Sequence, residues 1–370
     1  TLEAVQKNIQ EDLNNKRDAI YMERCLQLAQ KGQGATAPNP MVGCVIVYNQ
    51  QIIGEGWHTK AGEAHAEVNA IQKVKDTALL KKSTLYVNLE PCSHFGKTPP
   101  CANLILKYKI PNVVVAIPDP NPKVAGKGIK LLTDAGCNVT VGVLEKEATE
   151  LNRRFITFHQ KKRPYIILKW AQSKDGFIAP EKTKNTPPEV FWISTLASQQ
   201  LAHQWRSEEA CILVGVNTVI ADNPQLTTRN WRGNHPLRLI LDPNNRTPKN
   251  AVVASDTHPS LFFSKDSEMR FNGNKKRVTL QPYSLESLMR YCAEQEHTSI
   301  LVEGGQKTLQ YFIEENLWDE ARVFTSPNRL NKGVKAPVLT GEPYQKSHVK
   351  EDVLTLFRNQ TNEQDFLDNA

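Results

Sequence analysis

The amino-acid sequence predicts an α/β protein with two domains, on the strength of three observations. The chain has 370 residues, a length that favours two domains over one. Short apolar runs with strand character alternate along it with segments of helical periodicity. A basic run that ends in proline, at residues 161–164, follows a charged helical segment and marks a boundary. We therefore expect a first domain at residues 1–160, a second at residues 161–358 and a polar tail at residues 359–370.

Each element of the first domain is assigned from a local signal. Helices are predicted where apolar residues recur every three or four positions, strands where apolar and β-branched residues form short runs, and loops where glycine and proline gather. In chain order, these signals predict a helix over Tyr21–Lys31, a loop over Gly32–Pro40, a strand over Val42–Val47 with a hairpin partner over Gln51–Gly56, a helix over Ala64–Val74, a strand over Leu85–Leu89, a helix over Cys101–Lys107, a strand over Val113–Ile117 and a charged helix over Leu144–His159.

The second domain begins with a strong strand signal at Tyr165–Trp170. The next predicted elements are a loop rich in lysine, proline and threonine over Pro180–Pro188, a helix over Ser194–Trp205, buried strands over Cys211–Val214 and Leu237–Leu241, and a strand from Ser299 that runs through Gly304 and Gly305 into a helix over Thr308–Asn316. A strand, two glycines and a helix start can seat a phosphate, because the helix N–H groups face it. A simple turn is the alternative, and the sequence contains no G-x-G-x-x-G fingerprint of a Rossmann domain.

The most informative motif joins His65-Ala66-Glu67, Pro91-Cys92 and Cys101. A histidine and two cysteines can hold Zn²⁺ with its fourth position open to water, and the glutamate is then free to move protons. We expect Pro91 to open a helix after the strand, where free N–H groups stabilise a thiolate. The alternative is that these are small core residues without a metal. The order of the parts favours zinc and is similar to that of the zinc-dependent nucleoside and nucleobase deaminases.

The spacing of the cysteines departs from the general deaminase pattern, which has two residues between them. Residues 93–100 intervene here, so this segment must loop out and return, and Pro99 and Pro100 favour a new helix start at Cys101. His94 could complete a closed four-ligand site, but a closed site leaves no room for the water on which Glu67 would act. We therefore expect His94 and Lys97 to face the substrate. A merely solvated Lys97 is the alternative.

Composition and charge narrow the function classes. The formal net charge is +7, but the basic residues are dispersed, so a small anionic ligand explains it more simply than nucleic acid. No apolar stretch approaches the roughly 20 residues that span a bilayer. Nothing at the start resembles a signal peptide, although residues upstream of Thr1 can be missing. The 7 cysteines indicate metal thiolates and a reducing compartment rather than disulfides. We expect a cytoplasmic homo-oligomer without nucleic-acid or membrane partners.

The chain resembles the bifunctional deaminase/reductase family of riboflavin biosynthesis, from about Tyr21 to Gly341. The motifs that carry the resemblance are Pro38–Gly43, Gly62–Val68, Leu89–His94 with Thr98–Cys101, Asp119–Pro122 with Val124–Gly126, Ser173–Gly176, Trp192–Ser194, Leu213–Gly215, Ala221–Pro224 and Val302–Gly305. The long segment between the cysteines is the form that this family has. The resemblance implies a cytidine-deaminase-like α/β/α first domain and a dihydrofolate-reductase-like α/β second domain.

The resemblance also implies site residues, position by position. One zinc ion per chain is implied on His65, Cys92 and Cys101, with Glu67 as the catalytic proton shuttle. Contacts to a small phosphorylated pyrimidine are implied in the first domain for Asn39, His58, His94, Lys97, Asp119 and Asn121. In the second domain, contacts to NADPH are implied for Ala171, Trp192, Thr218, Asp222, Gly305, Gln306, Lys307, Thr308, Leu309, Gln310 and Tyr311, and contacts to the substrate for Lys169, Arg206, Leu226, Arg229 and Glu303.

Particular side chains of the second domain qualify this assignment. Arg206 and Arg229 suit a phosphate, because planar guanidinium groups bind it bidentately. Val190 and Pro243 depart from the family, which has a serine two residues before the tryptophan and a small polar residue near the cofactor.

The implied mechanism has two steps. Glu67 takes a proton from water and returns it to leaving ammonia, while hydroxide replaces the ring amino group. A nicotinamide then delivers hydride to the ribosyl C1′, which opens the sugar to a ribityl chain. Lys169 and Glu303 are both candidates for the proton donor. Their simpler alternatives are a solvent-facing strand residue and a helix-capping carboxylate.

Two other classes of function fit part of the pattern. A deaminase that edits tRNA or nucleobases would share the metal ligands and suit the basic charge, but it would not need a second α/β domain. A binding protein without activity would keep the fold and lose Glu67 or a metal ligand, and neither is lost here.

Overall fold

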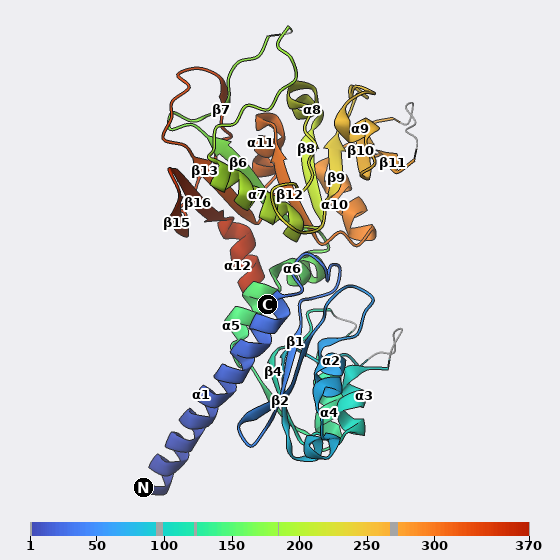
Figure 1. Ribbon diagram of the computed structural model, residues 1–370, viewed down its shortest axis with the longest axis vertical. Coiled ribbons are helices and arrows are strands. Elements are labelled where there is room, and N and C mark those ends of the chain that lie inside the picture. Colours follow the sequence, from blue (N-terminus) through green and yellow to red (C-terminus); the bar gives the residue numbers. More distant parts are fainter. Residues whose placement is uncertain (1, 94–98, 122–123, 184, 267–272, 370) are drawn as a thin grey trace. The chain divides into compact units, whose positions relative to one another are not determined.

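The computed structural model describes residues 2–93, 99–121, 124–183, 185–266 and 273–369. They form two compact units, which meet in the chain between Lys161 and Lys162. Each unit has its own sheet, with helices on both faces (Figure 1). Among the described residues, no helix combines the length and the apolar character needed to cross a membrane.

The first unit is built on a five-stranded sheet in the order β2-β1-β3-β4-β5. The strands are β1 (Gly43–Tyr48), β2 (Gln51–Trp57), β3 (Thr84–Leu89), β4 (Asn112–Ile117) and β5 (Asn138–Val141). Strand β1 is antiparallel to β2 and β3, whereas β3, β4 and β5 are parallel. Because β3 and β4 are parallel neighbours, Leu89 and Ile117 pair at their carboxyl ends, and the loops that follow both strands leave from one edge of the sheet.

Helices cover both faces of this sheet. They are α1 (Leu2–Gln30), α2 (Ala66–Lys73), the 3₁₀ helix η1 (Thr77–Lys82), α3 (Cys101–Lys107), α4 (Lys127–Asp134), α5 (Glu145–Leu151) and α6 (Arg153–Lys161). Helices α2, α3 and α4 bury Ile71, Ile105 and Leu132 in one apolar core with β1, β3 and β4. Helices α1 and α5 contact the strands from the opposite face (Figure 1). The result is the three-layer α/β/α arrangement expected of the first domain.

Most elements predicted for the first unit are confirmed, and three predictions are wrong in detail. Pro91 opens no helix, since residues 91–93 are neither helix nor strand and the carbonyl of Cys92 accepts the N–H of Ala102 in α3. The charged helix over Leu144–His159 is two helices, because the buried amide of Asn152 between them bonds both backbone groups of Met41. Helix α1 begins well before Tyr21, and α4 and β5 were not predicted.

The second unit contains a nine-stranded sheet in the order β11-β10-β9-β8-β12-β6-β13-β16-β15. Every neighbouring pair in this order from β11 as far as β13 is parallel. The hairpin of β15 and β16 is antiparallel and lies at the edge of the sheet. The strands are β6 (Tyr165–Gln172), β7 (Phe177–Ala179), β8 (Cys211–Gly215), β9 (Leu237–Leu241), β10 (Ser260–Ser264), β11 (Lys275–Thr279), β12 (Ser299–Gly304), β13 (Glu320–Thr325), β14 (Val334–Lys335), β15 (Gln345–Val349) and β16 (Asp352–Arg358). Strands β7 and β14 form a separate two-stranded ribbon.

The helices of this unit lie on both faces of the large sheet (Figure 1). They are α7 (Leu196–Glu208), α8 (Val216–Asp222), α9 (Val252–Ser255), α10 (Leu285–Glu294), α11 (Gln306–Glu314) and α12 (Gln360–Asn369). Successive residues of β6 alternate between the two cores, with Leu168 packing with α10 and α11 and Ile167 with α7. A buried carboxylate of β16, Asp352, accepts the Thr195 N–H at 2.7 Å and the Ser198 hydroxyl at 2.6 Å, which anchors the start of α7.

The expected polar tail from residue 359 is wrong, because residues 360–369 form α12. The side-chain amide of Asn362 donates to the carbonyls of Asn316 and Trp318, and Phe366 is buried. Tertiary hydrogen bonds therefore hold a helix that the polar sequence did not indicate. Strands β7, β10, β11, β13, β14, β15 and β16 and helices α8, α9 and α10 were also not predicted.

One buried carboxylate organises the edge of the first unit at which β3 and β4 end. Glu90 follows β3 directly, is 3% exposed, and accepts hydrogen bonds of 2.8 to 3.2 Å from the backbone N–H groups of Asp119, Gly126, Gly128 and Ile129. A Cβ on Gly128 would lie 2.0 Å from the Pro91 carbonyl oxygen. The start of α4 is therefore held closely against the segment that carries Cys92.

Glu90→Gln should loosen the segment from Asp119 to Ile129. The NH₂ group of the glutamine would face backbone N–H donors, and the negative charge that they stabilise would be gone. The free energy of unfolding of the unit should fall by roughly 3 kcal/mol. Hydrogen exchange of the Gly126, Gly128 and Ile129 amides should accelerate, whereas Glu147→Gln, on the exposed face of α5, should leave it unchanged. Equal protection in both variants would contradict this role of Glu90.

Candidate metal centre and ligand cavity

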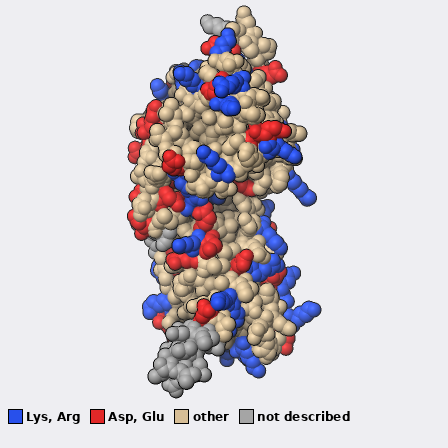
Figure 2. Space-filling view, turned by 90° about the vertical axis from the view of Figure 1, so that its left-hand side faces the viewer, with Lys and Arg blue, Asp and Glu red and all other residues tan. Residues whose placement is uncertain are grey.

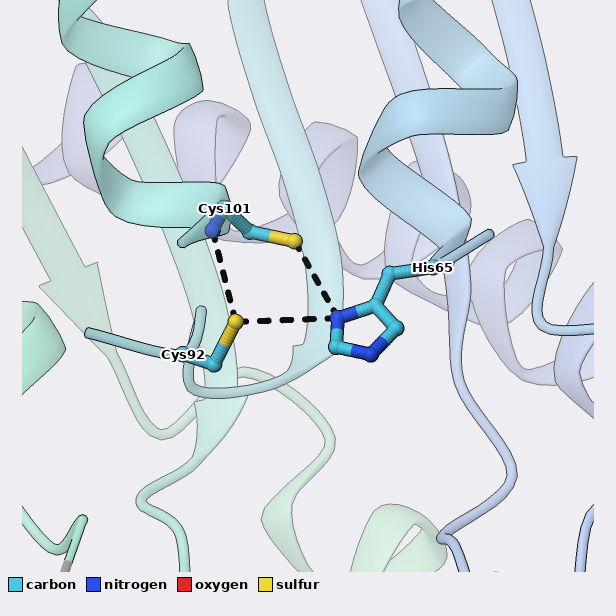
Figure 3. A group of neighbouring side chains, drawn as sticks. All are labelled: His65, Cys92 and Cys101. Carbon is cyan, nitrogen blue, oxygen red and sulfur yellow. Dashed lines mark hydrogen bonds between the residues drawn. The ribbon is translucent and has the colours of Figure 1, made fainter. Parts of the chain in front are cut away.

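Three side chains from separate elements converge in the first unit (Figure 3). His65 is the N-cap of α2, Cys92 follows β3, and Cys101 is the first residue of α3. His65 Nδ1 lies 3.6 Å from Cys92 Sγ and 3.3 Å from Cys101 Sγ, and the three donor atoms are all within 4.8 Å of one another. Ligand atoms at tetrahedral zinc are about 3.6 Å apart for the usual Zn–N and Zn–S lengths. The donor set and spacing therefore fit three corners of a zinc site with one position open.

The protonation of Cys92 also suits a metal. Hydrogen bonds from the Cys101 thiol and from His65 lower the pKa of Cys92 to about 4 although burial opposes them. The backbone N–H of Cys101 donates to the same sulfur at 3.3 Å. Cys92 is thus readily present as the thiolate, which is the form that binds a metal.

Glu67 lies beside the three ligands without being one of their group. It occupies the first turn of α2 and is 3% exposed. Burial raises the pKa of Glu67, and the nearby Cys92 adds to that effect. A carboxyl group whose pKa is moved towards neutrality can both accept a proton and give it back, as a general acid/base must.

Asn39 and His58 form a second polar pair next to the ligands. The Nδ1–H of His58 donates to the Ala64 carbonyl at 3.1 Å, so His58 Nε2 accepts from the Asn39 amide, also at 3.1 Å. The His58 ring meets the His65 ring edge-on, with centroids 5.6 Å apart. Burial lowers the pKa of His58. A neutral His58 and its amide partner therefore adjoin the candidate metal ligand His65.

The other residues expected at this site are placed only in part. Asp119 and Asn121 follow β4 at the edge shared with β3, and Asp119 Oδ1 accepts the Asn121 N–H at 2.8 Å. The hydrogen bond from the Asp119 N–H to Glu90 connects this loop to the segment of Cys92. His94 and Lys97 lie outside the described residues.

The second unit contains a cavity of about 840 Å³, within the usual size range of small-molecule sites. Strands β6, β8 and β12 contribute residues from their carboxyl ends to its wall. All positions expected to bind cofactor or substrate in this unit line the cavity except Gln310, whose side-chain oxygen instead accepts the Val338 N–H. The departures Val190 and Pro243 also line it.

The beginning of α11 offers a seat for phosphate in this cavity. Gly305 has φ +71°, and a Cβ there would lie 3.0 Å from Thr218 Oγ1. Helix α11 starts at the next residue, Gln306, so its free N–H groups are available to an anion that approaches closely. These features fit a phosphate group.

A buried ion cluster occupies another part of the wall. Arg206 donates from Nε and Nη2 to the two oxygens of Glu303, at 2.7 Å each, and from Nη1 to the Thr227 carbonyl at 3.1 Å. Lys169 Nζ lies 3.8 Å from Glu303. Burial alone would raise the pKa of Glu303, but the charges of Arg206 and Lys169 outweigh it and lower the pKa to about 2. Burial lowers the pKa of Lys169.

This pairing changes the expectation for the two arginines. The guanidinium of Arg206 is already engaged by Glu303 and Thr227, so it does not present a free fork to a phosphate in this structure. Among the described residues, no carboxylate pairs with the guanidinium of Arg229. Arg229 is therefore the arginine left to receive an anion.

Sequence reasoning missed three residues at these sites. Lys182 donates to Asp222 Oδ1 at 2.9 Å and to the Ala221 carbonyl at 2.8 Å, which ties the loop after β7 to α8. Only its place in a lysine-rich loop could have drawn attention to it. Glu90 stood within a recognised motif without an assigned role, and His203, which lines the cavity, lies one helical turn before Arg206.

Charged side chains of both signs are mixed on one face of the molecule. On the face shown in Figure 2, the described Lys and Arg side chains are interspersed with Asp and Glu and do not form a continuous basic band.

The purified chain should contain one zinc ion per chain by elemental analysis. Cys92→Ser and Cys101→Ser should each remove most of the metal, because a hydroxyl is a much poorer zinc ligand than a thiolate. Cys137→Ser, at a half-buried cysteine of the same unit outside the group, should keep it. Full zinc content in Cys92→Ser would exclude the proposed ligands.

The second unit should lose stability in acid partly through Glu303. The pKa of its carboxylate is lowered to about 2 in the fold, so its contribution, roughly 3 kcal/mol, is present at neutral pH and is lost as pH falls from about 4.5 towards 2. The measurement is denaturant unfolding followed by tryptophan fluorescence, because every tryptophan except Trp57 lies in this unit. In Glu303→Gln this part of the pH dependence of the free energy of unfolding should disappear. Glu314→Gln, at an exposed position of α11, should behave as the unchanged chain does, and the same steepness in Glu303→Gln would refute the assignment.

Comparison with family models supports both units. Residues 164–361 match the RibD C-terminal domain, and residues 15–117 match the cytidine and deoxycytidylate deaminase zinc-binding region. Among solved structures, Acinetobacter baumannii RibD (form 1) is similar with a TM-score of 0.84 and 32% identity, covering 93% of this chain and 99% of that one. A Thermotoga maritima diaminohydroxyphosphoribosylaminopyrimidine deaminase/5-amino-6-(5-phosphoribosylamino)uracil reductase gives 0.84 and 34% over the same shares.

Two relatives are similar over most of their length. The riboflavin biosynthesis protein RibD of Aquifex aeolicus is 42% identical over 323 residues, which is 86% of this chain and 89% of the relative. The protein of the same name from Bacillus amyloliquefaciens is 39% identical over 338 residues, or 89% of each. With the deaminase motif and the second α/β unit both in place, the chain belongs to the RibD family of riboflavin biosynthesis proteins.

Proposed function

We propose that this chain catalyses two successive reactions of riboflavin biosynthesis on a phosphorylated pyrimidine. The first is hydrolytic deamination of diaminohydroxyphosphoribosylaminopyrimidine, assigned to residues 1–160. The second is reduction of the ribosyl group to a ribityl chain by NADPH, assigned to residues 161–358. The observation that carries the proposal is the convergence of His65, Cys92 and Cys101 next to the buried Glu67, in one chain with the cavity around Glu303.

In the deamination step, His65, Cys92 and Cys101 would hold the zinc. Zinc, when bound, supplies Lewis-acid chemistry that makes water acidic near neutral pH. Glu67 accepts the proton of the attacking water on a carboxylate oxygen and donates it to the departing ammonia. Asn39, which the neutral His58 holds in place, orients the pyrimidine beside these groups, because its amide can donate and accept hydrogen bonds without adding charge.

In the reduction step, the start of α11 would hold the dinucleotide phosphates, and Ala171, Trp192 and Thr218 would line the rest of its path. NADPH, when bound, supplies the hydride. Glu303, with a pKa of about 2, is a carboxylate at neutral pH and has no proton to give. Lys169, whose pKa is lowered by burial, is the better donor to the opening sugar oxygen.

The wider setting is proposed on the same grounds. We infer a cytoplasmic homo-oligomer that binds neither nucleic acid nor membrane. All seven cysteines are free, in keeping with a reducing compartment.

A two-stage assay tests the function. The zinc-loaded chain should release ammonia from the diamino substrate without NADPH, and NADPH should then be oxidised only after that release. Glu67→Gln should keep its zinc, lose ammonia release by roughly 10³-fold and still reduce the deaminated compound, because only the proton shuttle is removed. Glu63→Gln, an exposed glutamate on the preceding loop, is the matched control. Undiminished ammonia release by Glu67→Gln would rule out its role.

A further inference from the structure

A histidine in the wall of the cavity of the second unit has one ring nitrogen in a hydrogen bond and one without a hydrogen-bond partner among the described residues. His203 lies on α7, is 1% exposed and lines the cavity. Its Nδ1 accepts the backbone N–H of Arg229 at 3.0 Å. An accepting Nδ1 carries no proton, so the proton of the neutral ring is on Nε2.

The Nε2 atom is buried and has no hydrogen-bond partner among the described residues. Leaving such an N–H unsatisfied costs about 1–3 kcal/mol, and buried polar groups are rarely left so. Gln199, Ala202 and Arg206 also line the cavity, and their helical spacing places them on the same side of α7 as His203. A ligand in the cavity is therefore the natural source of the missing acceptor.

The surrounding charges indicate what kind of acceptor it is. Arg206 is engaged by Glu303, whereas Arg229 lacks a carboxylate partner among the described residues. Burial and the positive charges of Arg206 and Arg229 lower the pKa of His203 to about 4. At neutral pH the ring is thus an uncharged donor in a cationic setting, which suits an anionic oxygen.

We propose that His203 binds the substrate of the reduction step, with Nε2–H donating to an oxygen of its phosphate while Nδ1 holds the Arg229 backbone so that the guanidinium reaches the same group. The substrate phosphate is then bound by His203 and Arg229 rather than by Arg206 and Arg229. This inference rests on the proposed function for the identity of the substrate. The contacts of His203 themselves do not depend on it.

Two variants separate the roles of the ring nitrogens. In His203→Asn the amide oxygen can still accept the Arg229 N–H, but no donor reaches the Nε2 position. In His203→Gln the longer amide can restore that donor and loses the acceptor near Nδ1. His297→Asn is the matched control, at a half-buried histidine of the same unit outside the cavity lining.

Steady-state reduction of the deaminated substrate is the first measurement. His203→Asn should raise its KM about tenfold or more, with kcat and the KM for NADPH unchanged, and His203→Gln should recover much of the loss. If His203 only supports Arg229, His203→Asn should resemble the unchanged chain and His203→Gln should be the worse variant. That order overturns the proposal.

Calorimetric titration with ribose 5-phosphate, without NADPH, keeps the test independent of the reaction. The unchanged chain should bind it, and His203→Asn should bind about tenfold more weakly. If the unchanged chain reduces nothing but binds ribose 5-phosphate more tightly than His203→Asn does, the proposed function is wrong and the phosphate site at His203 is supported. If the unchanged chain does not bind ribose 5-phosphate, or both chains bind it equally, the assignment of a phosphate site at His203 is wrong.

Discussion

A buried carboxylate at the carboxyl end of a parallel strand must be given hydrogen-bond donors, and both units of this chain are organised around one. Glu90 follows β3 and receives backbone N–H groups, whereas Glu303 lies in β12 and receives the guanidinium of Arg206. Backbone donors cannot move away without refolding the loop, so Glu90 makes a rigid frame beside the segment that carries Cys92. Side-chain donors keep their charge and can change partners, so Glu303 makes an ionic cluster suited to chemistry.

The engagement of Arg206 redistributes the roles in the second cavity. Because the Arg206 guanidinium is paired with Glu303, Arg229 and uncharged donors such as His203 are the groups in the wall that can attract an anion. The same pairing holds Glu303 ionised, which leaves Lys169 as the neighbour with a proton to transfer. In the reaction that we propose, this one ion pair would decide both where a phosphate is held and which group acts as an acid.

The convergence of His65, Cys92 and Cys101 and the alternation of strands and helices could be predicted from the sequence, because each depends on local spacing. The beginning of α3 is an example, since Pro99 and Pro100 indicate it within the motif itself. What could not be read depends on contacts distant in the chain. Asn152 ends a helix in order to bond Met41, the polar helix α12 is held by Asn316, and Arg206 is engaged by a residue of β12. Residue type and spacing carry no record of such partners.

The three candidate metal ligands come from the start of α2, the segment after β3 and the start of α3. No two of them are neighbours in sequence, so their donor atoms meet only in the folded unit. A metal that binds only this arrangement stabilises it by mass action. The supply of zinc in the cell therefore becomes a term in the lifetime of the protein. A chain synthesised under zinc limitation would spend more time open to proteolysis in its first unit, so the amount of protein would fall together with its activity.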